Sequence, residues 1–231
     1  MLTATHESDG ERVLTARVEE AVVDTELVSA LGAMLDNAEH AGIENFVLIF
    51  AGNAETVAGD FPVWPPGCGR ADMRYFARWD ELLARISRLT AKTFAGYHGR
   101  VGAAAIQAGL VMDLRLASAD ARLSLGSLAE GRFPGMGAYW LPKFIGLGAA
   151  RRMVLLGEDL TAADAARISL LDVVEPTLDT SVENTVKALR PVTPEAASFS
   201  RRILDDCYLL EHGAAAELAK AARYRVGDSG S

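Results

Sequence analysis

Apolar and polar positions alternate along residues 11–20, "ERVLTARVEE", as in a strand that buries one face. From Asp24 to Ala41 the apolar residues instead recur at helical spacing, and Asp24 or Thr25 has the side chain of a helix N-cap. The run "NFVLIFAG", which ends at Gly52, is continuously apolar, as is typical of a strand buried on both faces of a parallel sheet. These segments predict a strand, a helix and a second strand, in that order.

The alternation of strands and helices continues after a Gly- and Pro-rich loop at residues 53–70. A helix with one apolar face is predicted from Tyr75 to Leu89, and the strand "KTFAGYH" follows it. Next come a helix of small residues and a pair of strands, "MDLRLAS" and "ARLSLGS". This order is typical of an α/β core.

The remainder of the chain, from Gly137 onward, is predicted to be mostly helical. Pro142 is expected to break the helix, because proline removes a hydrogen bond inside a helix. One strand-like piece follows at "SLLDVVE", and an Ala-rich helix begins at Pro194. The predicted fold class is therefore α/β with a helical C-terminal extension.

Composition narrows the class of protein. The 231 residues are half hydrophobic with a net charge of -8, which argues against nucleic acid or an anionic membrane as the main partner. Cys68 and Cys207 form no zinc motif, so we expect neither a metal nor a disulfide framework. Residues 1–10 lack the apolar core of a signal peptide, and no apolar run reaches the length of about 20 residues that a membrane helix needs. A cytoplasmic protein is predicted.

The segment "HGRVGAAAIQAG" runs from His98 to Gly109, and its second part is poor in side chains. Six of the eight residues from Gly102 onward are Gly or Ala. The first N–H groups of a helix have no partner within it, and that end carries a partial positive charge. It can stabilise an anion or a carbonyl oxygen that is becoming one. The alternative is a tight contact between helix and sheet, for which small residues are equally suited.

A second loop has the same character. The segment "VLIFAGNAETVAGDF" also runs from a buried strand into a turn with small residues, at positions 58–60. Two turns of this kind could converge on one oxygen and form an oxyanion hole.

Five segments, in order along the chain, resemble motifs of the enoyl-CoA hydratase/isomerase (crotonase) superfamily. "AGD" at 58–60 resembles A-G-x-D, "HGRVGAAA" resembles N-G-x-A-x-G-G-G, and Asp113 with "LRLASADARL" resembles D-x-R-x-A-x-x-x-A-x-F. "GRFPGMGAYWLPKFIGLGAAR" resembles G-x-x-P-G-x-G-x-x-x-L-P-x-x-I-G-x-x-x-A, and "GEDLTAADAARISLLDVVEP" resembles T-G-x-x-x-x-A-x-x-A-x-x-x-G-L-V-D-x-V. The resemblance covers nearly the whole chain.

This resemblance implies a crotonase-type spiral of repeated ββα units, residues 1–190, followed by a helical trimerisation region, residues 191–231. It implies a homotrimer or a hexamer. It also implies an acyl-CoA substrate, so that coenzyme A is part of the substrate and no separate cofactor is needed. Two backbone N–H groups would hold the thioester oxygen, one from Asp60 or Gly59 and one from Ala104.

The chain departs from the family at its two catalytic glutamates, whose positions hold Gln107 and Ser127. An amide cannot ionise, and an isolated serine is a poor base near neutral pH, so ordinary hydration is not expected. Glu130 is a candidate acid or base close to the second position, and the alternative is a surface carboxylate. His98 replaces the usual Asn of the family and is expected to make a supporting hydrogen bond rather than to remove a proton.

A further set of residues is expected to line the substrate site. They are Gly59, His98, Gln107, Ser127 and Met136.

The missing glutamates limit the functions that we expect. More distantly, the chain resembles the hydratase-like accessory enzymes of 3,5-dihydroxyphenylacetyl-CoA biosynthesis, which work with a type III polyketide synthase and sister hydratases. The leading hypothesis is an enzyme that dehydrates or isomerises a polyketide-derived acyl-CoA through an enolate in an antibiotic pathway. The alternatives are a catalytically weak accessory protein, or pseudoenzyme, that supports a polyketide synthase or a sister hydratase, and a decarboxylase of the same fold.

Overall fold

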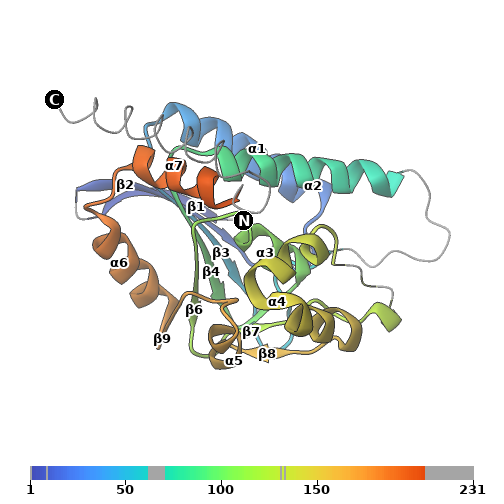
Figure 1. The fold of residues 1–231 in the computed structure, drawn as a ribbon. Helices are drawn as coiled ribbons and strands as arrows, with labels where there is room; N and C mark the ends of the chain where they lie inside the picture. Colours follow the sequence, from blue (N-terminus) through green and yellow to red (C-terminus); the bar gives the residue numbers. More distant parts are fainter. Residues whose placement is uncertain (1, 9, 62–70, 131, 133, 206–231) are drawn as a thin grey trace, which may run out of the picture.

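Figure 1 shows the computed structural model, which describes residues 2–8, 10–61, 71–130, 132 and 134–205. The strands are β1 (Leu2–Ser8), β2 (Glu11–Val18), β3 (Asn45–Ala51), β4 (Lys92–His98), β5 (Arg100–Val101), β6 (Leu114–Ser118), β7 (Arg122–Leu123), β8 (Leu160–Thr161) and β9 (Val173–Glu175). The helices are α1 (Thr25–His40), α2 (Ala71–Arg88), α3 (Ala103–Gly109), α4 (Gly137–Leu156), α5 (Ala162–Arg167), α6 (Leu178–Leu189) and α7 (Pro194–Asp205), with a 3-10 turn η1 (Leu128–Glu130).

The strands form two sheets. The larger has the order β1-β2-β3-β4-β6-β9, antiparallel between β1 and β2 and parallel at every other pairing. The smaller has the order β5-β7-β8. Two stretches, β4-β5-α3 and β6-β7-α4, repeat the order strand, strand, helix along the chain. The predicted α/β class with ββα units is confirmed, although β6 and β7, predicted as a pair of strands, lie in different sheets.

Strand β3 is buried along its whole length, as its continuous apolar run predicts. Phe46, Leu48 and Phe50 belong to the larger hydrophobic core, which includes the buried faces of α1 and α2. Val47 and Ile49 belong to a second cluster, which includes the buried residues of α6. Helices therefore cover both faces of the parallel sheet (Figure 1), as parallel sheets require.

Helix α1 begins where the sequence predicts, because the Asp24 carboxylate accepts a hydrogen bond from the N–H of Leu27 at 2.8 Å. The prediction of a helix break at Pro142 is wrong. Helix α4 continues through Pro142 and is interrupted at Gly146, whose φ is 74°. The φ angle that proline fixes is compatible with a helix, whereas a positive φ of this size favours glycine.

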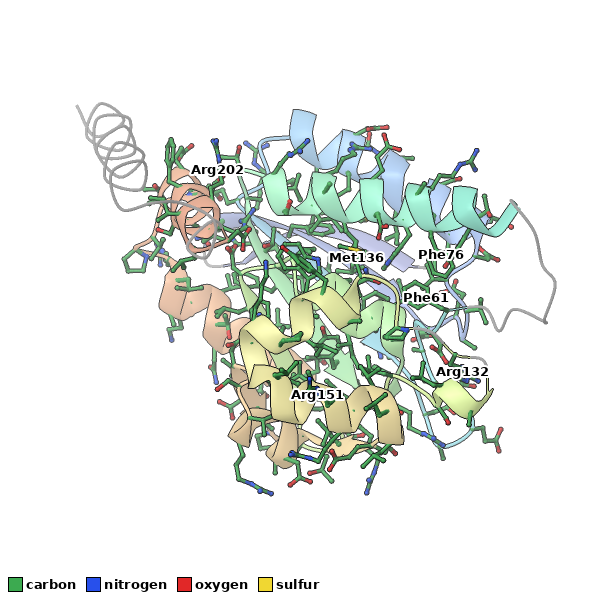
Figure 2. All side chains as sticks on the ribbon, turned by 45° about the vertical axis from the view of Figure 1, so that its right-hand side comes forward. Phe61, Phe76, Arg132, Met136, Arg151 and Arg202 are labelled. Carbon is green, nitrogen blue, oxygen red and sulfur yellow. The ribbon has the colours of Figure 1, made fainter. Side chains whose placement is uncertain are left out.

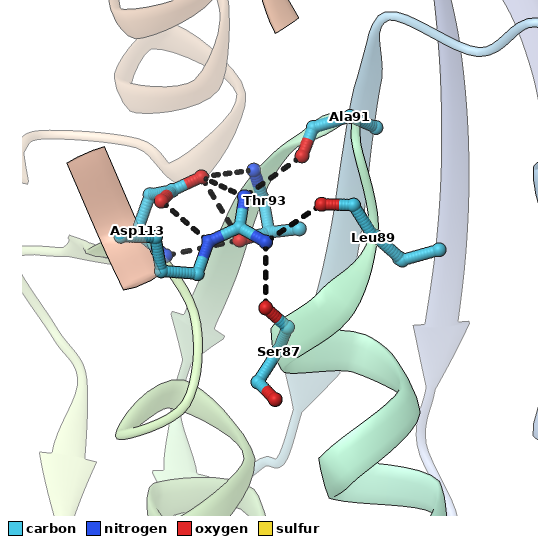
Figure 3. A network of polar contacts seen from close by, with 6 residues as sticks. Ser87, Leu89, Ala91, Thr93 and Asp113 are labelled. Atoms are coloured by element: carbon cyan, nitrogen blue, oxygen red, sulfur yellow. Dashed lines mark hydrogen bonds and ion pairs between the residues drawn. The ribbon is translucent and has the colours of Figure 1, made fainter. Parts of the chain in front are cut away.

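The predicted C-terminal region, residues 191–231, is described as far as Asp205. Helix α7 packs against α2 and β4, so this part of the region contacts the core. Its Arg201 is buried and forms hydrogen bonds with Asp113 and with the carbonyl groups of Ser87, Leu89 and Ala91 (Figure 3). The division into two domains stays a prediction.

Candidate functional site

The site is organised around α3, whose residues are all buried. Its N-cap, Gly102, donates its N–H to the carbonyl of Ala58 at 2.9 Å, and Ala105 donates to the carbonyl of Gly59 at 2.8 Å. A side chain on Gly102 would place its Cβ 2.7 Å from the Cβ of Asp60. The small residues therefore let the 58–60 loop lie directly against the start of α3.

The first N–H groups of α3 have different partners. Ala103 donates to Oδ1 of Asp60 at 3.4 Å, and Ala105 donates to Gly59. Within the described part of the chain, the N–H of Ala104 has no acceptor. Ala104 was the second predicted donor, and its N–H is the one at this helix start that remains unused.

The other predicted donor belongs to the 58–60 loop, where both candidate N–H groups are already engaged. Gly59 donates to the carbonyl of Glu20 at 3.0 Å, and Asp60 donates to the carbonyl of Ala21 at 2.9 Å. The segment at Val22 runs parallel to Asp60 and forms a β-bridge with it. Both N–H groups are therefore bonded to backbone carbonyls in this structure, which differs from the expected hole with two free backbone donors.

The side chain of Asp60 lies at the start of α3. Its Oδ1 accepts a hydrogen bond from the N–H of Phe61 at 2.9 Å, in addition to the long one from Ala103. Its Oδ2 forms an ion pair with Arg132, which is labelled in Figure 2. Burial raises the pKa of the Asp60 carboxyl, and the charge of Arg132 opposes that rise. Asp60 thus supplies a negative charge where the helix favours one.

Gln107 lies one turn along α3 from Ala104 and is fully buried. Its Oε1 accepts a hydrogen bond from Nε1 of Trp79, on α2, at 3.1 Å. Its Nε2 has no hydrogen-bond partner among the residues that the structure describes. The sequence identified Gln107 through the family motif, but it gave no indication that Trp79 would fix the orientation of this amide.

Gln107 also lines a cavity of about 240 Å³, which we call the small cavity. Met136, which is 41% exposed, and Trp140 of α4 line it as well, together with Asp80 and Leu83 of α2. Gln107 and Met136, both predicted to line the substrate site, therefore border one cavity. This arrangement presents an amide donor to a mainly apolar space.

The remaining predicted residues lie elsewhere. Oγ of Ser127 accepts a hydrogen bond from the N–H of Ala129 at 3.2 Å, within a local turn. Glu130 ends η1, and its side chain lies outside what the structure describes. Nδ1 of His98 lies 3.0 Å from Oγ of Ser118 and 3.3 Å from Asp120, beside a different cavity of about 430 Å³.

Within residues 2–8, 10–61, 71–130, 132 and 134–205, no group of three or more His, Cys, Asp or Glu residues is arranged to hold a metal ion. None of the helices there has the length and apolar character needed to cross a membrane.

Known proteins resemble this chain in sequence. Residues 59–209 match the family model of the enoyl-CoA hydratase/isomerase family. A probable enoyl-CoA hydratase of Bacillus subtilis is 24% identical over 154 residues, which are 65% of this chain and 60% of that protein. The chain thus spans about 60% of the length of this curated relative.

Solved structures share the fold over almost the whole chain. An enoyl-CoA hydratase of Mycobacterium smegmatis is similar with a TM-score of 0.83 and 24% identity, covering 97% of this chain and 90% of that one. An enoyl-CoA hydratase of Bacillus anthracis has a TM-score of 0.82 and 18% identity, covering 96% and 89%.

Proposed function

The chain belongs to the enoyl-CoA hydratase/isomerase family, and from that premise we propose that it acts on an acyl-CoA thioester through an enolate. One observation carries the proposal. Two buried donors one turn apart on α3, the N–H of Ala104 and Nε2 of Gln107, have no acceptor in the described part of the chain. A buried donor without a partner is costly, so a ligand oxygen is its natural acceptor.

The chemistry follows from these two donors. Hydrogen bonds to the thioester oxygen stabilise the enolate more than the neutral carbonyl, because negative charge develops on that oxygen as the α-proton leaves. Dehydration and double-bond isomerisation both pass through such an enolate. Gln107 cannot remove the proton, so its part is to donate a hydrogen bond and to orient the acyl group.

Two carboxylates are candidates for the proton transfer. Asp60 is buried at the start of α3, and its raised pKa suits a group that exchanges protons nearer neutral pH. Glu130, proposed from the sequence, ends the η1 turn. Asp60 carries the stronger structural support, because its carboxylate contacts the same helix start as Ala104.

The finer proposal is a polyketide-derived thioester in an antibiotic pathway, converted beside a type III polyketide synthase. It is supported by the sequence resemblance alone. The same resemblance is the support for a trimer or hexamer. A second candidate function is favoured by one observation. The Asp60 carboxylate, paired with Arg132, already occupies the anion-favouring helix start, as expected of an accessory protein that binds a thioester without turnover.

Deuterium exchange tests the proposal. The full chain is incubated with butyryl-CoA in D₂O, and incorporation at the α-carbon is followed by mass spectrometry, because enolate formation is common to every reaction considered. Ala104→Pro removes the unused N–H in the first turn of α3, where proline disrupts a helix less than in its interior. We expect exchange to fall about 100-fold.

The control for that variant is Gly148→Ala, on an open part of α4. Thermal unfolding of both variants shows whether the fold is kept. Exchange that is equal in Ala104→Pro and the wild type would remove the backbone donor from the mechanism. No exchange above the buffer rate, with acyl-CoA still bound, would leave the accessory-protein function.

A further inference from the structure

A second and larger cavity, of about 520 Å³, lies beside the small one. Its walls come from β4, β6, α4, α6 and α7. Most of the lining is apolar, and its apolar residues include Trp140, Phe144 and Leu204. Trp140 lines both cavities, so they are neighbours, whereas Gln107 lines only the small one. The volume lies within the range of about 300 to 1,000 Å³ that is usual for small-molecule sites.

Four cationic side chains line this large cavity, and three of them have carboxylate partners. The pairs are Lys92 with Glu11 at 2.9 Å, Arg115 with Asp172 at 2.7 Å and Arg201 with Asp113 at 2.7 Å. The fourth cation is Lys143, on α4.

Lys143 has no such partner. Its Nζ is buried and makes no hydrogen bond or ion pair within the described part of the chain. The Nζ atom instead lies 4.2 Å from the ring centre of Tyr139 and 4.3 Å from that of Trp140. Aromatic faces attract an ammonium group, but they leave its three N–H donors without an acceptor. A buried ammonium of this kind calls for an anion.

We propose that the large cavity binds a carboxylate attached to an apolar chain, with the carboxylate on Lys143. The apolar body lies against Trp140, Phe144 and Leu204, which supply the hydrophobic wall. Lys143 and the large cavity form a site separate from the donors of α3.

The carboxylate has two possible sources. It can belong to a free acid such as octanoate, or to the far end of an ω-carboxyacyl thioester that passes Trp140 from the small cavity. The second source rests on the proposed function, and the first does not. Octanoate and suberyl-CoA therefore serve as the two probes, because a failure of acyl-CoA chemistry leaves the octanoate result untouched.

Isothermal titration calorimetry of the full chain tests the proposal with octanoate, with suberyl-CoA and with uncharged octan-1-ol. We expect Lys143→Gln to weaken the binding of at least one carboxylate probe about 10-fold or more and to leave octan-1-ol unchanged. Lys143→Arg keeps the charge and should restore most of the affinity. Lys187→Gln, on the exposed face of α6, is the matched control and should bind like the wild type.

Four results would overturn the proposal. Neither carboxylate binds the wild type, or Lys143→Gln binds both as tightly as the wild type does, or octan-1-ol binds as tightly as octanoate. A fourth is a change of oligomeric state in Lys143→Gln, measured by analytical ultracentrifugation, with carboxylate affinity unchanged. That outcome would assign the missing anion to a second copy of the chain.

Discussion

Arg201 on α7 and Asp113 before β6, 88 residues apart in sequence, form a bidentate ion pair with both contacts at 2.7 Å. The guanidinium makes three further hydrogen bonds, to the carbonyl oxygens of Ser87, Leu89 and Ala91. All five N–H donors of the arginine are therefore used. Since the group is buried, this pair fixes α7 against the end of α2 and the start of β4.

Replacing Arg201 with methionine should destabilise the fold strongly. The substitution leaves the Asp113 carboxylate without its counter-charge and removes one hydrogen bond from each of three carbonyl groups. We expect a loss of about 3 to 5 kcal/mol in the free energy of unfolding, measured by urea denaturation. Arg202→Met, at the neighbouring exposed position, should change it by no more than about 0.5 kcal/mol. Similar losses in the two variants would contradict a structural role for the pair.

Local patterns in the sequence predicted many of the helices and strands, although not strand β1. The Asp24 cap and the continuous apolar run of β3 depend on neighbouring residues, and both are found as predicted. The break predicted at Pro142 is wrong, because proline disfavours a helix interior but does not exclude it. The helix is interrupted at Gly146 instead.

The site was less predictable, because its geometry depends on partners far apart in the chain. The sequence located Ala104 and Gln107 through a motif. It could not show that the carbonyls of Glu20 and Ala21 would take the N–H groups of Gly59 and Asp60. A motif specifies which residues stand at a helix start, and tertiary contacts decide which of their donors remain unused.

The Asp60 carboxyl should make folding stability depend on pH. Because burial raises its pKa in the folded state, its contribution to stability is fully present at acid pH. That contribution falls as pH rises from the ordinary aspartate pKa of about 4 through the raised folded value. The free energy of unfolding of the wild type minus that of Asp60→Asn should therefore decrease from acid to neutral pH, measured by urea denaturation.

The exposed Asp159 provides the control for that series, since Asp159→Asn removes one negative charge at the surface. A difference for Asp60→Asn that stays flat or increases with pH would show that Arg132 outweighs burial.

The hydrogen bond between Trp79 and Gln107 should appear as a coupling energy. Gln107→Leu leaves the buried indole N–H without an acceptor, and Trp79→Phe leaves the amide oxygen without its donor. In a double-mutant cycle measured by thermal unfolding, we expect the double variant to lose about 1 kcal/mol less stability than the sum of the losses in the two single variants. Additive losses would mean that this bond does not hold the amide, and that Gln107 is oriented by packing alone.

The close approach between α3 and the 58–60 loop predicts a large effect from one methyl group. In Gly102→Ala the new Cβ would lie 2.7 Å from the Cβ and 2.8 Å from the Cα of Asp60, so the loop must move. Overpacking of this kind costs about 1 to 3 kcal/mol. It should also lower α-proton exchange, because displacing the loop changes the surroundings of Ala104. In Gly148→Ala nothing lies within 4 Å of the new Cβ, and the helix should gain up to about 1 kcal/mol. Equal stability of the two variants in urea would mean that α3 and the loop can separate at little cost, and the small residues would then need another explanation.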